Sequence, residues 1–314
     1  MIASASIVIL ILNYNGYEDT INCLESVLKS SYQNYRIVVV DNASSDGSPQ
    51  MIKEEFPQVK LIESPENLGF GRANNIAIKQ SDAKYCFLLN TDTVLVNNAV
   101  KILFDFMEKP DKSDVGGCGG QLYNADMTHQ SSVGEFDTID KLYKKALGIN
   151  FTPIICRYKH IFNTKSRKQK EKQEETSLVY SSSYEPDFII GADLMLRKSA
   201  LDKVGAFDEK FFMFGEEAEL CFRLKKHGFR IMFVPESKII HFGGASAYKS
   251  NTLIAVEKMV LNGTILFFKV CYDEEAAKKA KLLYIIYYLR YLPLRFFSPR
   301  AFQRLNMALE AKIN

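Results

Sequence analysis

The chain lacks the cysteine pattern of a disulfide-stabilised secreted domain or of a zinc site. Its six cysteines are scattered, and no two of them form a C-x-x-C pair. Several lie in apolar runs, where a reduced cysteine behaves as a small core residue. The pattern therefore favours a reducing, cytoplasmic environment.

Long hydrophobic runs are missing as well. The apolar run at residues 7–12 is too short to span a bilayer, and it has neither a basic segment before it nor a small-residue cleavage site after it. We expect a buried strand there rather than a signal peptide. With 47% hydrophobic and 25% charged residues, the 314-residue chain can form one large α/β domain or two smaller ones.

The first ninety residues alternate strand and helix signals. Short aliphatic runs predict four strands, at residues 7–12, 36–40, 59–62 and 85–89, and segments with apolar residues at helical spacing separate them. A continuous aliphatic run is typical of a parallel strand that is buried on both faces. Repeated β-α-β units of this length indicate an α/β fold with a doubly wound sheet and right-handed crossovers.

Polar side chains follow three of the predicted strands. Asn13, Asp41 and Asp92 come directly after apolar runs. Because ligands of such sheets bind where the carboxyl ends of the strands open into a crevice, these side chains should converge on one edge. Asp92 suits a divalent cation on a diphosphate, and Asp41 suits hydrogen bonding to a nucleotide base. For both residues, a cap on the turn that follows is the alternative role.

The segment at residues 67–75 combines glycines with a cation. Gly69 and Gly71 allow a ligand to approach the backbone, and the guanidinium of Arg72 suits a phosphate group. The glycines do not follow the first strand, so they are not the fingerprint of a dinucleotide-binding fold.

A cluster of acidic residues follows an aromatic segment in the second half of the chain. Glu216, Glu217 and Glu219 have phenylalanines on both sides. Crowded carboxylates in apolar surroundings have a raised proton affinity, which suits a general base that works near neutral pH. The alternative is an acidic first helical turn that the helix dipole favours, and it accounts best for Glu219.

His241 lies between a strand-like segment and a loop of small residues. A lone histidine is most often structural, but this one occurs in a chain that already has a candidate metal ligand. The other three histidines, His129, His160 and His227, have no such context.

The ordered motifs of the chain resemble those of the family 2 glycosyltransferases, and most of all their rhamnosyltransferase-like branch. The matching segments are residues 11–16, 39–48, 67–71, 88–92 and 205–219. Five motifs in the same order make a specific signal. The resemblance implies the GT-A fold, in which a Rossmann-like, mostly parallel central sheet is flanked by helices, here with a C-terminal helical extension.

The resemblance also implies a role for each candidate residue. One set would bind the nucleotide-sugar donor: Asn13, Asn15, Asp41, Arg72, Asn74 and Asn90. Asp92 would hold Mg or Mn on the donor diphosphate, and His241 would complete the metal site. Glu217 would be the catalytic base, with Glu216 as its rival.

Three positions depart from the family pattern. The metal motif often has carboxylates at both ends, whereas its first position here is Asn90. The base is commonly the aspartate of a Glu-Asp pair, whereas here it is Glu217. Asn74 occupies the place of the usual arginine, and Arg72 would substitute for it.

The predicted function is an inverting glycosyltransferase that moves a sugar from a nucleotide-diphosphate donor to a glycan or lipid-linked acceptor in cell-surface polysaccharide or glycolipid synthesis. Two alternatives stay open. One is a non-catalytic module that binds nucleotide sugars or glycans, and the other is a sugar nucleotidyltransferase. The latter would require a glycine-rich basic loop after the first strand, and residues 13–16 are not such a loop.

The predicted catalytic domain covers residues 1–250, and the helical, basic and aromatic extension covers residues 251–314. Residues 134–185 are expected to be a variable insertion, because residues 157–175 are dense in charged residues and poor in apolar ones. A solvated loop is the favoured structure for this stretch. The alternative is an insertion that recognises the acceptor.

Seven cations and no acid occur in residues 276–304, where they alternate with tyrosines and phenylalanines. This pattern favours contact with an anionic membrane, and so a peripheral position at the inner face of the cytoplasmic membrane. The alternative is a helix that packs on the body of the protein or on the second subunit of a homodimer. One short basic segment is too little to indicate a nucleic-acid partner.

Overall fold

A computed structural model of the chain describes residues 5–148, 182–243, 253–291 and 299–313. The chain divides into two units, one comprising Met1–Phe136 and Ser181–Leu253 and the other Asp137–Tyr180 and Ile254–Asn314. Residues 137–148 of the predicted insertion therefore group with the C-terminal helices rather than with the first unit. The charged stretch at residues 157–175 lies outside the described residues.

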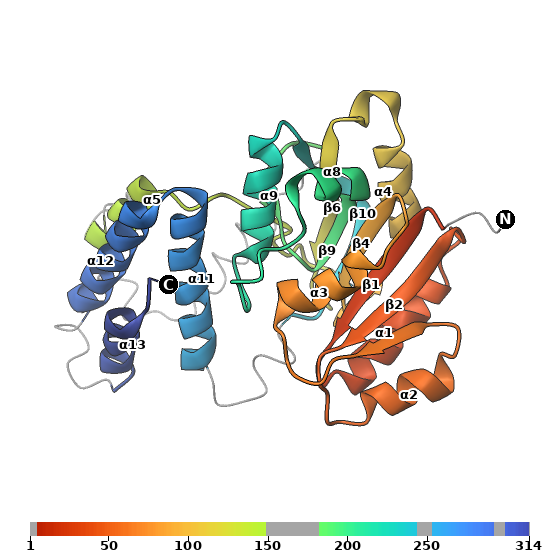
Figure 1. Ribbon diagram of the computed structural model, residues 1–314, viewed down its shortest axis with the longest axis horizontal. Coiled ribbons are helices and arrows are strands. Elements are labelled where there is room, and N and C mark those ends of the chain that lie inside the picture. The colour runs from red at the N-terminus through yellow and green to blue at the C-terminus, as the bar shows by residue number, and fades with distance from the viewer. Residues whose placement is uncertain (1–4, 149–181, 244–252, 292–298, 314) are drawn as a thin grey trace. The chain divides into compact units, whose positions relative to one another are not determined.

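The first unit is built on an eight-stranded sheet (Figure 1). Its strands lie in the order β3-β2-β1-β4-β9-β6-β10-β5. Strand β9 pairs antiparallel with β4 and β6, β5 pairs antiparallel with β10, and the remaining neighbours are parallel. The strands are β1 (Ile7–Asn13), β2 (Tyr35–Asp41), β3 (Lys60–Glu63), β4 (Tyr85–Asn90), β5 (Thr93–Leu95), β6 (Val115–Tyr123), β9 (Asp193–Arg197) and β10 (Arg230–His241). The predicted mostly parallel α/β sheet is confirmed.

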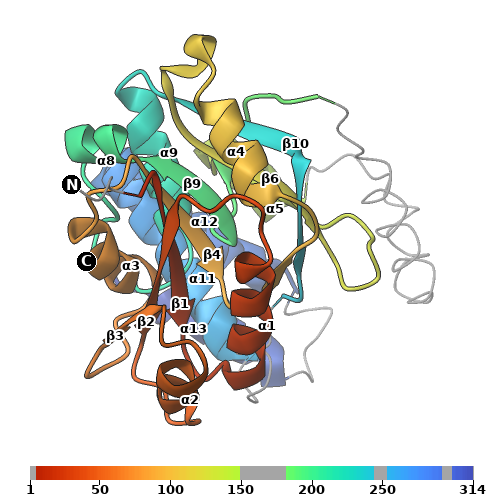
Figure 2. The same ribbon diagram turned by 90° about the vertical axis from the view of Figure 1, so that its right-hand side faces the viewer.

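Helices cover both faces of this sheet (Figure 2). One face carries α1 (Tyr17–Leu28), α2 (Ser48–Glu55) and α4 (Ala99–Met107), whose apolar residues form one core with the strands. The other face carries α3 (Phe70–Lys79), α8 (Lys198–Val204) and α9 (Glu216–Lys226). Strand β1 is buried on both faces, as its continuous aliphatic run predicted.

Strand β6 carries no strand signal in the sequence. Four of its nine residues are glycines, and glycine has a low propensity for strands. The packing requires them, because a Cβ atom at Gly120 would lie 2.6 Å from the backbone oxygen of Ser237 in β10. Residues 188–197 contribute to two different sheets: β8 (Phe188–Ile189) pairs with β7 (Val133–Gly134) in a separate small sheet, and β9 belongs to the main sheet.

The second unit is helical, as predicted for the extension. It contains α5 (Ile139–Leu147), α11 (Leu253–Cys271), α12 (Glu274–Tyr291) and α13 (Pro299–Glu310). Its core includes Leu142 of α5, Phe268 of α11, Tyr284 of α12 and Met307 of α13. Within the described ranges, no helix is both long and apolar enough to cross a bilayer.

Most of the described cations in residues 276–304 bond within this unit. Lys278 pairs with Glu274, and Arg304 pairs with Glu257. Two others donate to backbone carbonyls: Lys281 to Ala311, and Arg290 to Lys145 and Ala146 at the end of α5. These contacts agree with the alternative in which the basic segment packs on the protein. Arg295 lies outside the described residues.

Candidate active site

A buried polar network joins the carboxyl ends of β1 and β2. The Asn13 amide donates to Asp41 Oδ2 and to Ser48 Oγ, each at 2.7 Å, and Asp41 Oδ1 accepts from the backbone N–H of Ser44 at 2.9 Å. Asn13 is 0% exposed and Asp41 is 2% exposed. Asn13 therefore fixes Asp41 and the turn that follows β2.

Other polar residues at the carboxyl ends of β1 and β2 connect neighbouring loops through hydrogen bonds. Asn15 is exposed, adopts a φ of 52° and accepts at Oδ1 from the backbone N–H of Ser45 at 2.8 Å. Asn42 Oδ1 accepts from the backbone N–H of Leu68 at 2.8 Å, and its amide donates to Asn67 Oδ1 at 2.9 Å. The end of β2 is thus linked to the loop that precedes α3.

That loop also holds the aromatic segment before α9. The backbone N–H of Phe70 donates to the Phe212 carbonyl at 2.8 Å. Gly69 has a φ of +77°, and a Cβ atom there would lie 2.0 Å from the same carbonyl oxygen, so only glycine fits. Asn75 completes the attachment, because its amide group exchanges hydrogen bonds with the backbone N–H and carbonyl of Phe207.

The two remaining candidates on α3 have different surroundings. Arg72 is exposed on the first turn of the helix. Asn74 is 1% exposed, and its amide donates to the Phe70 carbonyl one turn earlier at 3.0 Å. Donor binding remains a prediction for both residues.

Asp92 and His241 lie together although they are far apart in the sequence. The antiparallel pairing of β10 with β5 sets His241 opposite Thr93, and His241 Nε2 is 3.4 Å from Asp92 Oδ1. Each side chain is 15% exposed. Thr93 closes the turn after β4 by donating from Oγ1 to the Asn90 carbonyl at 2.6 Å.

This pair fits a divalent cation. Carboxylate oxygen and imidazole nitrogen are ordinary ligands, and adjacent ligands about 2.1 Å from an octahedral ion lie about 3 Å apart. Across the ranges that the structure describes, no group of three or more His, Cys, Asp or Glu residues could hold a metal. A cation held by these two side chains would complete its coordination with oxygen atoms from water or from a bound ligand.

The acidic cluster forms the first turn of α9. The chain reaches it through Phe214 and Gly215, both with positive φ. Glu216 is 3% exposed and its Oε2 atom has no partner in the described structure; burial, and then the charge of Glu217, raise the pKa of Glu216 well above its usual range. Glu217 is only partly buried, and burial raises its pKa as well. Glu217 is therefore the more accessible of two carboxyl groups with raised proton affinity.

Gly191 and Ala192 lie between Glu217 and the end of β4 in the folded structure. A Cβ atom at Gly191 would lie 3.9 Å from the Glu217 Cβ. The next residue, Ala192, accepts from the backbone N–H of Asn90 at 3.1 Å. Glu217 and the turn that carries Asp92 thus flank the same short stretch of backbone.

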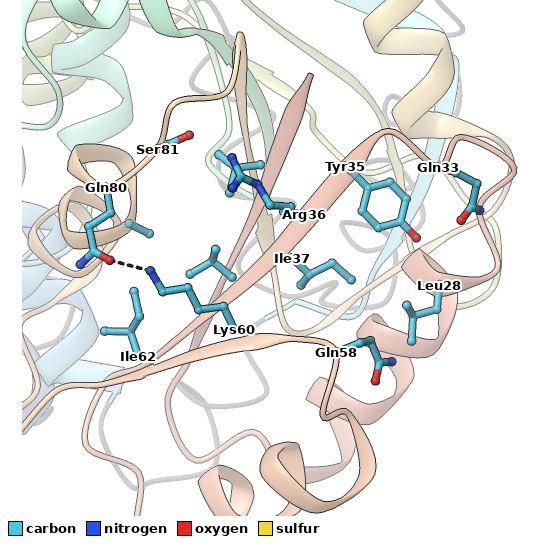
Figure 3. A pocket seen from close by; sticks show the side chains of 13 residues that line it. Leu28, Gln33, Tyr35, Arg36, Ile37, Gln58, Lys60, Ile62, Gln80 and Ser81 are labelled. Atoms are coloured by element: carbon cyan, nitrogen blue, oxygen red, sulfur yellow. Dashed lines mark hydrogen bonds between the residues drawn. The ribbon is translucent and has the colours of Figure 1, made fainter. Parts of the chain in front are cut away.

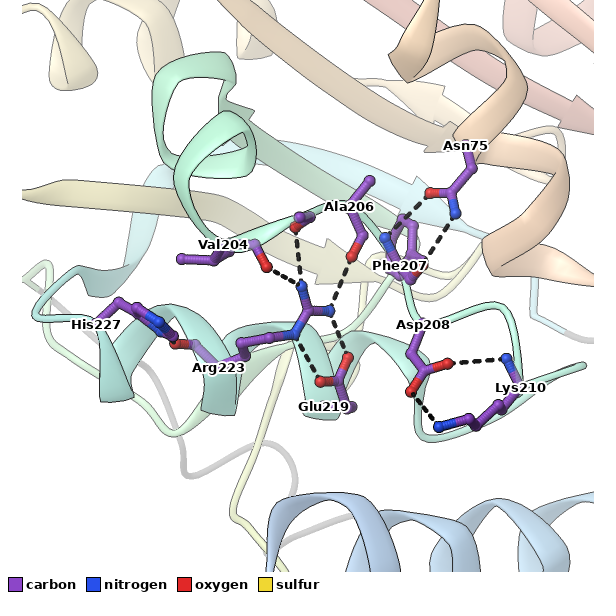
Figure 4. A network of polar contacts seen from close by, with 10 residues as sticks. Asn75, Val204, Ala206, Phe207, Asp208, Lys210, Glu219, Arg223 and His227 are labelled. Atoms are coloured by element: carbon purple, nitrogen blue, oxygen red, sulfur yellow. Dashed lines mark hydrogen bonds and ion pairs between the residues drawn. The ribbon is translucent and has the colours of Figure 1, made fainter. Parts of the chain in front are cut away.

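Glu219 forms an ion pair with Arg223 inside the protein (Figure 4). Arg223 donates to both of its carboxylate oxygens, at 2.7 and 2.6 Å, and also to the Val204 carbonyl at 2.7 Å. Glu219 is 3% exposed, so its charge is buried and paired. The sequence pattern favours a helix-dipole role for this residue and does not predict the ion pair.

A separate cavity of about 350 Å³ lies at the amino ends of β2 and β3, away from the carboxyl ends that carry the candidate site (Figure 3). Its lining includes Arg36, which pairs with Asp82, and Lys60, which donates to Gln80 at 2.8 Å. None of the predicted site residues lines this cavity.

Gln130 is not predicted from the sequence, although it lies beside Asp92 and His241, the two candidate metal ligands that we call the metal pair. Gln130 Oε1 is 2.8 Å from His241 Nδ1, across 111 positions of the chain. Gln130 belongs to no motif; the hairpin that follows β6 and the register of β6 against β10 together bring it there.

Residues 6–205 match the family described as glycosyl transferase family 2, and this match ends before Glu217 and His241. The N-acetylglucosaminyl-diphospho-decaprenol L-rhamnosyltransferase of Mycobacterium tuberculosis is 25% identical over 229 residues, which cover 69% of this chain and 70% of that protein. The rhamnosyltransferase WbbL of Escherichia coli is 28% identical over 245 residues, which cover 75% and 83%.

Solved structures share the architecture at low sequence identity. The mannosyltransferase PcManGT of Pyrobaculum calidifontis, in complex with GDP-Man and Mn²⁺, aligns with a TM-score of 0.54 and 13% identity over 97% of this chain and 84% of that chain. GalNAc-T7 with UDP, GalNAc and Mn²⁺ aligns with a TM-score of 0.60 and 16% identity over 98% and 55%. Since the family match spans more than half of the sequence, the chain belongs to glycosyl transferase family 2 and has the GT-A fold.

Proposed function

We propose that the protein is a metal-dependent, inverting glycosyltransferase. It transfers a sugar from a nucleotide-diphosphate donor to a hydroxyl group of a glycan or lipid-linked acceptor. The observation that carries this proposal is the arrangement of Asp92, His241 and Glu217 around the end of β4. The rhamnosyltransferase names of the two relatives support a deoxyhexose donor, and the diphospho-decaprenol in the first name supports a lipid-linked acceptor.

In this mechanism Glu217 accepts the proton of the acceptor hydroxyl while its oxygen attacks the anomeric carbon. The new carbon–oxygen bond forms as the bond to the donor diphosphate breaks, so the configuration inverts and no covalent enzyme intermediate is needed. The raised pKa of Glu217 increases its proton affinity, which suits a base at neutral pH.

Asp92 and His241 are the residues that would hold Mg²⁺ or Mn²⁺. The bound cation supplies positive charge to the departing diphosphate. Two solved structures with the same fold contain Mn²⁺, which supports a metal in this chain. The nucleotide is proposed to bind along the edge formed by Asn13, Asn15 and Asp41, with Asn90 beside the diphosphate.

A donor screen tests the proposal. Purified full-length protein is mixed with uridine, guanosine and thymidine diphosphate sugars, and nucleoside diphosphate release is followed with Mn²⁺ or Mg²⁺. At least one donor should turn over only with a metal. Donor binding without turnover toward any acceptor would favour the binding module, and pyrophosphate release from a nucleoside triphosphate would favour a nucleotidyltransferase.

The metal ligands are tested by substitution. Asp92→Asn should weaken metal-dependent donor binding at least about tenfold, because a charged ligand of the cation is lost. The matched control is Asp105→Asn, at an exposed carboxylate of α4 that pairs only with its helix neighbour Lys101 in the described contacts. Equal donor binding by the wild type with and without metal would rule out this part of the proposal.

A further inference from the structure

Gln130 lies on a hairpin that returns from the end of β6. The backbone N–H of Gln130 donates to the Leu122 carbonyl at 2.9 Å, and the turn between them is closed by a bond from the Asn124 N–H to the Thr128 carbonyl at 2.8 Å. The parallel register of β10 with β6 sets Ile240 beside Tyr123. The next residue of β10 is His241, so the sheet itself places the hairpin beside the metal pair.

The neighbours of Gln130 fix the orientation of its amide. Its Nε2 atom lies 3.2 Å from Asn124 Oδ1 and 3.4 Å from the His241 carbonyl oxygen, and both of these atoms are acceptors. The Asn124 amide is itself oriented, because its Nδ2 donates to Thr128 Oγ1 at 2.9 Å. Gln130 therefore presents Oε1, an acceptor, to His241 Nδ1.

This orientation gives Nδ1 of His241 a hydrogen-bond acceptor at 2.8 Å. The other ring nitrogen, Nε2, faces Asp92 Oδ1 at 3.4 Å. An imidazole that binds a cation through Nε2 carries its proton on Nδ1, and Gln130 Oε1 is placed to accept from that N–H group. Without Gln130, the ring would lose the partner that favours this tautomer and fixes its orientation.

We propose that Gln130 is a positioning residue for the metal site. By accepting from Nδ1–H it holds the His241 ring in the tautomer whose Nε2 lone pair is available to a divalent cation beside Asp92. Second-shell partners of this kind typically change metal affinity by about 10- to 100-fold when they are removed. The use of the cation rests on the proposed function, whereas the hydrogen bond between Gln130 and His241 Nδ1 does not.

The tautomer can be measured directly in the metal-free protein. The chain has four histidines, so ¹⁵N-histidine labelling gives a small set of ring signals, and His241→Gln identifies those of His241. We expect a protonated Nδ1 that donates to Gln130 Oε1. An unprotonated Nδ1 would overturn the proposal, and this experiment requires no substitution of Gln130.

Metal affinity gives an independent readout, with Mn²⁺ alone as the probe and broadening of the His241 signals as the measure. Gln130→Met keeps the length of the side chain but removes the acceptor, and should weaken Mn²⁺ binding about 10- to 100-fold. Gln130→Glu keeps an acceptor and should bind within about threefold of the wild type. Gln58→Met, at an exposed position after α2, is the control.

Wild-type Mn²⁺ affinity in Gln130→Met would refute the positioning role. Neither measurement involves sugar transfer. A protein with the expected tautomer and Mn²⁺ affinity but no turnover of any donor would therefore contradict the proposed function and leave the role of Gln130 standing.

Discussion

Glu216 and Glu217 are adjacent in the sequence but have different surroundings, because successive residues of a helix point about 100° apart. Glu216 is turned into the protein and has an oxygen without a described partner, whereas Glu217 keeps access to solvent. The deeper burial of Glu216 favours its neutral form, and a neutral carboxylic acid cannot take a proton from a substrate. We therefore assign the base to Glu217 within the proposed mechanism.

The pH dependence of transfer tests this assignment. A base acts in its deprotonated form, so kcat/KM should be full above the pKa of Glu217 and fall as the pH drops through it. Because burial raises this pKa, the acidic limb should lie above the value of about 4.3 of an ordinary glutamate.

The rates are measured from acidic to weakly alkaline pH, with Glu216→Gln beside the wild type. Glu216→Gln should retain the acidic limb. Disappearance of that limb in Glu216→Gln would assign the base to Glu216 instead.

At the residue scale, the sequence indicates which polar side chains lie at strand ends, but it does not indicate which distant side chains form hydrogen bonds or ion pairs with one another. The proximity of Asp92 and His241 could be expected because each stands next to a strand end, and metal binding by the pair stays a prediction. Gln130 and Arg223 could not be predicted, because their partners depend on strand register and helix contacts rather than on a local pattern.

At the scale of elements, α3 and the segment before α9 are held together by backbone contacts. Gly69→Ala should destabilise the protein by about 3 kcal/mol, since it combines a left-handed φ with overlap against the Phe212 carbonyl. Gly228→Ala is the matched control, because Gly228 has a φ of +84° and open space around it, and should cost only about 1 kcal/mol. Equal losses in urea denaturation would mean that the contact with Phe212 does not constrain the loop.

The ion pair of Glu219 and Arg223 fixes α9 to the end of α8. Arg223→Met leaves the buried Glu219 carboxylate without its main partner, and the free energy of unfolding should fall by about 3–5 kcal/mol. Adding Glu219→Gln should recover part of this loss. Lys29→Met, which breaks the exposed pair with Glu25 on α1, should change stability by less than about 0.5 kcal/mol. Similar losses in Arg223→Met and Lys29→Met would refute the structural role.

The elements of the first ninety residues follow from local periodicity, and the structure confirms them. Strand β6 could not be predicted, because its glycines are selected by close approach of β10 rather than by strand propensity. The grouping of α5 with the C-terminal helices depends on packing between distant segments, which no local pattern encodes.

At the scale of the whole molecule, membrane contact is proposed to depend more on apolar side chains than on charge. Most of the described cations in the basic segment already have partners, whereas Leu282 and Leu289 on α12 are 56% and 45% exposed. The full-length protein should co-sediment with anionic liposomes, and the double variant Leu282→Gln with Leu289→Gln should lose most of this binding.

Val96→Gln, at a 42% exposed position of the first unit, is the control for that experiment. Absence of binding by the wild type would contradict membrane contact. If the double variant instead converts a dimer into a monomer in analytical ultracentrifugation, this face of α12 binds a second copy of the chain.

The proposed mechanism is tested most directly by comparing turnover with donor binding in Glu217→Gln. Glutamine keeps the shape of the side chain but cannot accept the proton, so transfer should fall by about 10²- to 10⁴-fold. Donor binding in the presence of Mn²⁺, followed by thermal shift, should stay within a few-fold of the wild type. Near-normal turnover in Glu217→Gln would contradict the assignment of the base and the mechanism built on it.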